Sequence, residues 1–192
     1  MGGYVKDVIL SEQALEQAKE YYKNSDHWYP VWQYYNLFHL DRLDVTTEDY
    51  ELEFLKELHN YSRKSHIVGC YFLRYPPDSF TRLHEDFDSE LTIVTLIDSK
   101  DLVGGECIIL SEYESPGPRP SHYACARHND KEKDKHAPYG LNIVPDIVNL
   151  EDGQSMIYGP DLTHGVSKVY QGERIVLITW FKNGERKRKH ET

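Results

Sequence analysis

The segment Arg82-Leu83-His84-Glu85-Asp86 decides how the second half of this chain is interpreted. It follows a run of residues with the character of a β-strand, and extended backbone places side chains two positions apart on the same face. His84 and Asp86 therefore point the same way and can hold one metal ion between them. A histidine two residues from an aspartate is also common in loops, so this pair alone is weak evidence for a site.

A second histidine, His164, strengthens the interpretation. It stands in the segment 162–166 (LTHGV), far along the chain from His84. Two histidines and one carboxylate, with coordination positions left open, form the facial triad of non-haem Fe(II) oxygenases. The long separation in sequence makes sense if the ends of two strands meet at the mouth of a barrel. The alternative for His164 is an ordinary turn histidine.

Arg174 follows at the start of a strongly apolar segment. In a strand, Arg174, Val176, Ile178 and Trp180 would share one face. A guanidinium can hold a carboxylate through two parallel hydrogen bonds, and a buried arginine without such a partner is costly. The alternative is an exposed arginine paired with Glu173. Each alternative is plausible alone, but together they explain the four residues less well than one site does.

Length and composition limit the classes of protein that this chain can belong to. The 192 residues, 39% of them hydrophobic and 28% charged, predict one soluble globular domain. A net charge of -10 argues against a nucleic-acid-binding surface as the main function. Three cysteines without a CxxC pair, Cys70, Cys107 and Cys125, favour reduced thiols.

The first residues of the sequence and the length of its apolar runs indicate where the protein is located. Residues 1–10 lack a signal-peptide pattern, and no apolar run approaches the ~18 residues that span a membrane. We therefore expect a cytoplasmic protein with no membrane partner.

The first third of the sequence predicts support elements rather than a site. Residues 11–23 have helical spacing after the capping residue Ser11, and residues 28–40 predict one or two aromatic-rich strands. A second helix is expected from a cap at Thr46 or Thr47 to about residues 63–64. Both helices should pack outside a sheet. Since no linker divides the chain, we expect a single domain over residues 1–192, with 1–65 supporting a core at 66–182.

From residue 66 the pattern changes to short strands with tight turns. Such a pattern predicts a sandwich or barrel, for example a jelly roll. The expected strands cover residues 66–75, 84–87, 91–97, 107–110 and 156–158, followed by a hairpin of 166–169 with 174–181.

Residues 111–145 form an insertion that is proline-rich and then charged. Loops of this length in compact domains are usually functional lids or disordered segments. The insertion holds His122, Cys125, His128 and His136, but the usual pairs of zinc ligands are missing, so solvated loop residues are favoured over a second metal site.

Several short motifs occur in a fixed order, and as a set they are specific. They are Tyr75, HED at 84–86, GGE at 104–106, DG at 152–153, HGV at 164–166, and GER at 172–174 leading to WF at 180–181. In these motifs the chain resembles the Fe(II)/2-oxoglutarate-dependent dioxygenases, within them the prolyl 4-hydroxylase-like branch. The resemblance covers roughly residues 68–181, with a gap over the insertion.

The resemblance implies a mainly β fold with flanking α-helices, a double-stranded β-helix (a jelly-roll, cupin-like barrel). It implies that three residues hold the iron: His84, Asp86 and His164. It implies that Arg174 binds the distal carboxylate of 2-oxoglutarate, that Tyr75 lies at this cosubstrate, and that the Thr95 hydroxyl helps to bind the same carboxylate. Trp180 falls where the family often has a tryptophan in the pocket wall.

The implied reaction consumes 2-oxoglutarate and O2, yields succinate and carbon dioxide, and hydroxylates an unactivated C–H bond. Fe(II) is the implied metal, and ascorbate is a candidate reductant. A prolyl residue of a peptide or protein is the first expected substrate, and a free amino acid or another small molecule is the alternative. A non-catalytic module that binds metal or 2-oxoglutarate also remains open, as does the oligomeric state.

Overall fold

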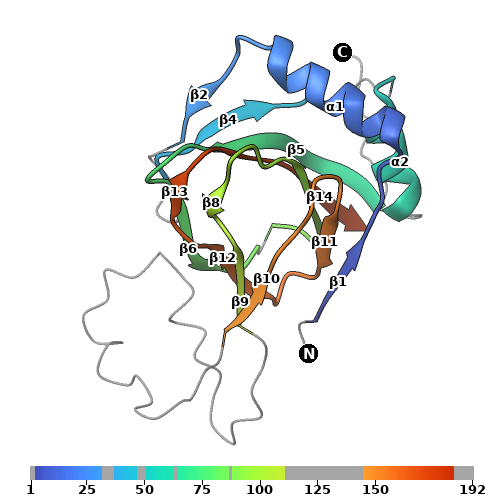
Figure 1. Ribbon diagram of the computed structural model, residues 1–192. Helices are drawn as coiled ribbons and strands as arrows, with labels where there is room; N and C mark the ends of the chain where they lie inside the picture. Colours follow the sequence, from blue (N-terminus) through green and yellow to red (C-terminus); the bar gives the residue numbers. More distant parts are fainter. Residues whose placement is uncertain are drawn as a thin grey trace, which may run out of the picture.

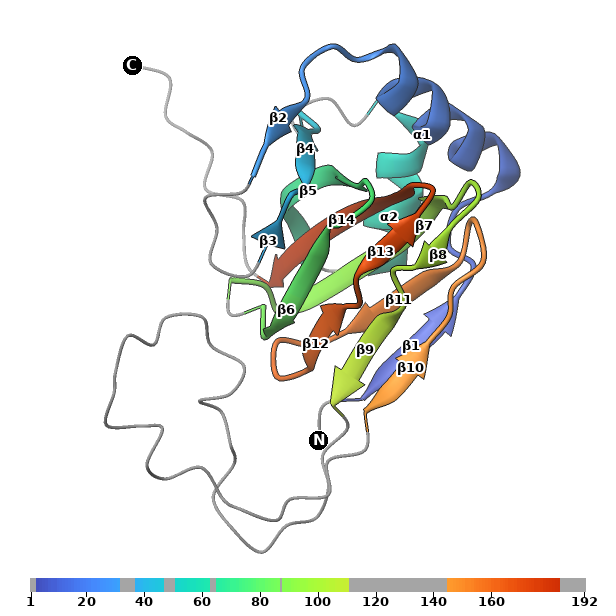
Figure 2. The ribbon, with the colours of Figure 1, turned by 60° about the vertical axis from the view of Figure 1, so that its left-hand side comes forward.

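Two antiparallel sheets face each other, and two helices cover the outer face of the larger sheet (Figures 1 and 2). The computed structural model describes residues 3–31, 37–46, 51–62, 65–86, 88–110 and 145–183. In chain order the elements are β1 (Tyr4–Asp7), α1 (Glu12–Asn24), β2 (Tyr29–Pro30), β3 (Leu37–Phe38), β4 (Asp41–Asp44), α2 (Glu53–Ser62), β5 (Ser65–Tyr75), β6 (Phe80–His84), β7 (Leu91–Asp98), β8 (Val103–Gly104), β9 (Cys107–Leu110), β10 (Asp146–Val148), β11 (Ser155–Tyr158), β12 (Thr163–Val166), β13 (Val169–Gln171) and β14 (Arg174–Asn183).

The order of the strands confirms the predicted jelly roll. The larger sheet contains the run β11-β7-β14-β5, and the smaller sheet contains β10-β9-β12-β6. From β5 onward the chain therefore crosses repeatedly from one sheet to the other, which is how a double-sheet jelly roll is wound. β1, β4 and β2 extend the larger sheet, so the N-terminal third adds strands as well as helices.

The predicted hairpin of residues 166–169 with 174–181 is wrong. β12 pairs with β6 and β9, and β13 pairs with β8. β14 instead lies between β5 and β7 in the other sheet. The reason is that β14 is apolar on both faces. Val176 lies in the core between the two sheets, and Leu177 lies in the outer core, between the larger sheet and the helices. Such a strand suits the centre of a sheet that is covered on both sides.

The first helix lies where its sequence predicts. The Ser11 hydroxyl accepts a hydrogen bond from the Ala14 backbone N–H at 3.2 Å and so caps α1. Its buried face, Ala14, Ala18 and Tyr22, packs on the sheet, and the Tyr22 hydroxyl donates to Asp98 at the end of β7 over 2.8 Å. Helix α1 is thus fixed to the larger sheet by both packing and a hydrogen bond.

The second helix begins later than predicted. α2 starts at Glu53 rather than directly after Thr46 or Thr47; residues 47–50 lie outside the described part of the chain. The backbone N–H of Glu53 donates to the side-chain oxygen of Gln17 on α1, over 2.6 Å. A residue of the other helix thus satisfies one of the free N–H groups at the helix start, a contact that local sequence does not reveal.

Other expectations fall partly outside the described residues. Within 28–40 the structure has the short strands β2 and β3, and residues 32–36 are not described. Almost the whole insertion, residues 111–144, is also outside the described residues. In the part of the chain that is described, no helix is long and apolar enough to cross a membrane.

The space between the sheets is filled by a second core, here called the inner layer. Its buried members come from both sheets and include Tyr75, Val94, Cys107, Ile109, Met156, Tyr158, Val166 and Val176. All the candidate site residues except Thr95 point into or border this layer, so the fold places them between two sheets rather than on an outer surface.

A slip in the pairing of β6 with β12 brings the candidate ligands together. His164 lies opposite His84, but Val166 lies opposite Thr81, so β6 uses one extra residue in this interval. Gly165 sits at the slip. A Cβ atom there would lie 2.9 Å from the Thr81 carbonyl oxygen and 3.1 Å from the Leu83 backbone nitrogen. Only glycine allows this close approach of the two backbones.

We predict that Gly165→Ala lowers the free energy of unfolding by about 1–3 kcal/mol, because the methyl group must push the two strands apart. Urea denaturation measures this change. Gly69→Ala on β5 is the matched control, since its Cβ would meet no atom closer than 3.5 Å, an ordinary contact with Trp180. Equal losses of stability in the two variants would contradict the steric explanation.

Candidate metal centre

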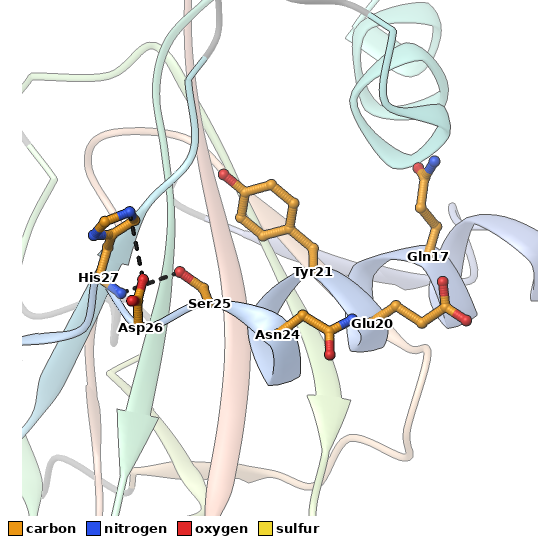
Figure 3. A pocket seen from close by; sticks show the side chains of 7 residues that line it. All are labelled: Gln17, Glu20, Tyr21, Asn24, Ser25, Asp26 and His27. Atoms are coloured by element: carbon orange, nitrogen blue, oxygen red, sulfur yellow. Dashed lines mark hydrogen bonds and ion pairs between the residues drawn. The ribbon is translucent and has the colours of Figure 1, made fainter.

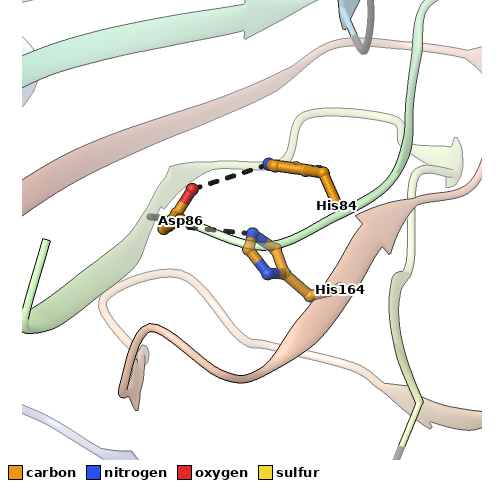
Figure 4. A group of neighbouring side chains, drawn as sticks. All are labelled: His84, Asp86 and His164. Carbon is orange, nitrogen blue, oxygen red and sulfur yellow. Dashed lines mark ion pairs between the residues drawn. The ribbon is translucent and has the colours of Figure 1, made fainter. Parts of the chain in front are cut away.

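His84, Asp86 and His164 converge in the described structure (Figure 4). Their ligand atoms, one from each side chain, all lie within 4.8 Å of one another. His84 is the last residue of β6, and His164 lies opposite it on β12 with the ring centroids 4.3 Å apart. The predicted strand over 84–87 is wrong, because β6 ends at His84. Asp86 reaches the histidines from the turn that follows.

Both imidazole rings present the same nitrogen to the centre. The Nδ1 atoms lie 2.8 Å from the Arg82 carbonyl oxygen and 3.0 Å from the Leu162 carbonyl oxygen. A carbonyl only accepts hydrogen bonds, so each neutral ring carries its proton on Nδ1 and keeps a lone pair on Nε2. The Nε2 atoms of His84 and His164 lie 3.7 Å and 3.9 Å from the carboxylate of Asp86. Two lone pairs and one carboxylate thus face a common point.

The carboxylate of Asp86 is held by one of its two oxygens. Oδ2 accepts hydrogen bonds from the Thr92 hydroxyl at 3.0 Å and from the Tyr158 hydroxyl at 3.1 Å. Ser89 in turn bonds to Thr92 over 2.7 Å. Oδ1 is left facing His84 Nε2, free to act as a single-oxygen ligand. Hydrogen-bonded supports of this kind orient the ligands of metal sites.

Thr92 and Tyr158 are functional residues that the sequence did not single out. Both lie in segments that are predicted as strands. Asp86 lies 72 residues before Tyr158 in sequence, and it meets Thr92 only because the chain turns between β6 and β7. No local pattern contains that information. The one available signal is that Thr92 and Tyr158 are polar residues within mainly apolar strands, a feature that they share with Thr95 and Ser155.

Burial keeps the His164 imidazole uncharged at neutral pH. It lowers the pKa of His164 to about 4, helped by the nearby His84 and opposed by Asp86. Burial, together with the charge of Asp86, raises the pKa of Tyr158 well above its ordinary value. At neutral pH, His164 therefore offers a lone pair and Tyr158 offers a proton, which is the arrangement that a cation and its carboxylate ligand need.

Arg174 is buried without a carboxylate partner among the described residues. The side chain is only 3% exposed, and its Nη1 atom has no hydrogen-bond partner there. Nη2 donates to the Cys107 sulfur at 3.1 Å, and the guanidinium lies 5.0 Å from the centre of the Tyr75 ring. The alternative pairing with Glu173 is not formed. Since a buried unpaired cation is costly, this arrangement calls for an anionic partner from outside the described residues.

The three remaining predicted residues fall in different places. Tyr75 is buried opposite Arg174 in register, and its hydroxyl bonds to Thr81 at 3.0 Å. Trp180 borders the inner layer, edge-on to Tyr71 with the ring centroids 5.6 Å apart. Thr95 is fully buried, but it points to the face of β7 opposite to Thr92. There its hydroxyl bonds to Ser155 on β11 at 2.8 Å, so the structure does not bring it to the triad.

Hollows that the described residues line include two in different parts of the fold. One, of about 200 Å³, is lined by Arg174, Cys107 and neighbouring residues, but by no member of the triad. The other, of about 460 Å³, runs along α1 and contains an Asp26–His27 ion pair (Figure 3). The side chains of that pair are 93% and 87% exposed, so their interaction is weak in water and we assign the second hollow no role.

Sequence comparisons find nothing: no family model matches the chain, and no curated protein matches it. Solved structures do match. A prolyl-4-hydroxylase from Pseudomonas putida is 14% identical, with a TM-score of 0.61, and the match covers 96% of this chain and 95% of that one. HygX from Streptomyces hygroscopicus, with nickel, 2-oxoglutarate and hygromycin B bound, is 12% identical, with a TM-score of 0.65 and coverage of 95% and 83%.

The chain has the fold of the Fe(II)/2-oxoglutarate-dependent oxygenases. A third structure with this fold is a prolyl hydroxylase from Trichoplax adhaerens in complex with a hypoxia inducible factor peptide fragment. It is 12% identical, with a TM-score of 0.57 and coverage of 93% of this chain and 83% of that one. At such identities the likeness to these oxygenases concerns the fold. The chemistry depends on the residues of the site itself.

The support of Asp86 can be tested with two variants of one strand. Thr92→Val removes a donor to Asp86 Oδ2 without much change in volume, and we expect it to weaken the binding of Mn(II) or Fe(II) about 10- to 100-fold. Thr95→Val removes a buried hydroxyl from the opposite face of β7 and should leave metal affinity unchanged. Anaerobic metal titration measures both, and similar affinities for the two variants would refute the role given to Thr92.

The low pKa of His164 predicts a pH dependence for the metal-free protein. In the unfolded chain, histidine binds a proton near its ordinary pKa of 6.5, whereas folded His164 does so only near pH 4. The unfolded state thus binds more protons in this window, and the free energy of unfolding must fall as the pH decreases from 6.5 to about 4. Denaturation at several pH values should show a smaller slope for His164→Gln. An unchanged slope would mean that His164 titrates normally.

Proposed function

We propose that this protein is an Fe(II)- and 2-oxoglutarate-dependent dioxygenase that hydroxylates an unactivated C–H bond. One observation carries the proposal. The inner layer holds a converging His-Asp-His set, in which the Tyr158 hydroxyl is the hydrogen-bond partner of His164 Nε2 at 2.9 Å, and, in the same layer, a buried arginine without an anionic partner among the described residues. Neither feature stabilises a core, because buried polar and charged groups lower the free energy of unfolding unless they are paired. Together they fit a metal and a dicarboxylate.

His84, Asp86 and His164 would hold the iron. Nitrogen and oxygen ligands suit Fe(II), and two histidines with one carboxylate leave further positions open for other ligands. When bound, the metal supplies the oxidative chemistry. The protein supplies orientation: the two backbone carbonyls fix the rings, and Thr92 with Tyr158 fixes the carboxylate.

Arg174 would bind the distal carboxylate of 2-oxoglutarate through its free Nη1. On β9, Ile109 lies opposite His164, and Cys107 lies opposite Val166. Cys107, which contacts Arg174, is therefore two residues along β9 from the position beside His164. That offset is about 7 Å along a strand, which a five-carbon dicarboxylate can span between Arg174 and the triad. The Tyr75 ring lies beside Arg174, and its hydroxyl bonds to that of Thr81. The placement of Thr95 on the outer face counts against the predicted contact of its hydroxyl with this carboxylate.

For the substrate we propose a prolyl residue of a peptide or protein. Tyr71 and Trp180 form an aromatic pair. Burial, followed by the charge of Asp86, raises the pKa of Tyr71, as expected for a buried ring close to the triad. The apolar surfaces of these two perpendicular rings suit a pyrrolidine ring. Two of the similar structures are described as prolyl hydroxylases. HygX, with hygromycin B bound, supports a small molecule as the second candidate.

The first test is succinate formation by the purified protein with Fe(II), 2-oxoglutarate and O2. We expect activity in the wild type and its loss in Asp86→Ala, because the metal loses its only carboxylate ligand. Arg174→Met should raise the KM for 2-oxoglutarate about 100-fold, since a buried charge-assisted pair is lost. His27→Ala and Arg74→Met are matched controls away from the inner layer. Their activity should equal that of the wild type.

Two outcomes would contradict the proposal. If folded, iron-loaded protein forms no succinate with any substrate, the non-catalytic binding module replaces the enzyme. If succinate formation is stimulated by free amino acids or aminoglycosides but not by proline-containing peptides, the enzyme remains and the prolyl substrate is wrong. Mass spectrometry of the peptide identifies the hydroxylated residue in the expected case.

A further inference from the structure

We propose that Cys107 is a redox modification site: a peroxide oxidises its thiol to an anion that pairs with Arg174 and blocks the binding of a dicarboxylate. The effect on 2-oxoglutarate rests on the function proposed above. The modification itself rests on the contacts of Cys107 alone. Its sulfur lies 3.1 Å from Arg174 Nη2, closer than any oxygen of a described carboxylate, and Nη1 of the same guanidinium has no partner.

The cavity beside Arg174 gives a small oxidant access to this sulfur. Cys107 is only 4% exposed, but it lines the hollow of about 200 Å³ together with Arg174, Gly105 and Glu106. No triad residue lines this hollow. A molecule the size of hydrogen peroxide can therefore reach the thiol without passing the candidate metal ligands. A reagent too large for this hollow cannot reach the thiol.

The chemistry proceeds in two balanced steps. The sulfur attacks one oxygen of hydrogen peroxide, an S–O bond forms as the O–O bond breaks, and the thiol proton leaves with the second oxygen as water. Sulfur loses two electrons and the peroxide gains them, giving a sulfenic acid. A second peroxide converts it in the same way to a sulfinic acid, which releases a proton to water and becomes an anion.

The guanidinium of Arg174 favours this product. A sulfinate carries two oxygens on a sulfur that already contacts Nη2, so it can supply the anionic partner that the buried cation lacks. An arginine held in this way no longer offers Nη1 to an incoming carboxylate. The oxidised protein should therefore be more stable than the reduced protein but bind 2-oxoglutarate more weakly.

Cys70 serves as an internal control within the same chain. It is 4% exposed, as Cys107 is, but it lies in the outer core, where its sulfur contacts the Thr179 hydroxyl at 3.6 Å and burial raises its pKa to about 12. It lines neither hollow. A thiol in these conditions is inert, so peroxide should spare Cys70 while it modifies Cys107.

The experiment uses the full chain with Cys125→Ser, so that this third cysteine does not react. Metal-free protein is treated with hydrogen peroxide, freed of excess reagent, and analysed by peptide mass spectrometry. Ni(II) and 2-oxoglutarate are then titrated by calorimetry. We expect added oxygen on Cys107 but not on Cys70, and a dissociation constant for 2-oxoglutarate that rises roughly tenfold or more. In Cys107→Ala, peroxide should leave the dissociation constant for 2-oxoglutarate unchanged, whatever its value before treatment.

Thermal unfolding gives a readout that needs no cosubstrate. Peroxide should raise the Tm by about 2–4 °C when Cys107 and Arg174 are both present. With Arg174→Met it should lower the Tm, because a buried sulfinate then has no partner. Unmodified Cys107, or a modified Cys107 with unchanged Tm, overturns the proposal. If reduced protein fails to bind 2-oxoglutarate, the dioxygenase function fails instead, and mass and Tm still decide whether Cys107 and Arg174 are coupled.

Discussion

The pairing of His84 with His164 across β6 and β12 is the constraint on which the rest of the site depends. Opposite residues of antiparallel strands have neighbouring side chains on one face, so the register alone brings the two imidazoles together. The slip at Gly165 keeps Thr81 and His84 on the inner side of the sheet although they are three residues apart. A register shift of one residue would turn His164 to the outer face and destroy the site.

The two cores of the molecule have different roles. The outer core is apolar and joins both helices to the larger sheet through residues such as Phe54, Phe72 and Leu177. The inner layer instead contains a carboxylate, a guanidinium and several hydroxyls among its apolar residues. Groups of this kind reduce stability unless they find partners, so the outer core must stabilise the fold that the inner layer uses.

Two errors of sequence interpretation have the same origin. The hairpin of 166–169 with 174–181 is a reasonable local reading, because a turn with Gly172 joins two apolar segments. The start of the second helix near Thr46 is equally reasonable, because threonine is a good capping residue. Both fail because distant segments supply better partners: β5 and β7 flank β14, and Gln17 of α1 satisfies the N–H of Glu53. Local preference is weak compared with such tertiary contacts.

The sequence by itself determined the fold class, many of the elements and the identity of the candidate ligands. Alternating and continuous apolar patterns marked most strands and the first helix, and the spacing of His84, Asp86, His164 and Arg174 marked a site. Only the tertiary structure decided which groups support that site. Thr92 and Tyr158 bond to Asp86, Cys107 contacts Arg174, and Thr95 faces away from the triad. The physical reason is that most of these contacts join segments distant in sequence, so they depend on strand order and register. The contact of Thr92 with Asp86 depends on the path of the chain between β6 and β7, which no local sequence pattern contains either.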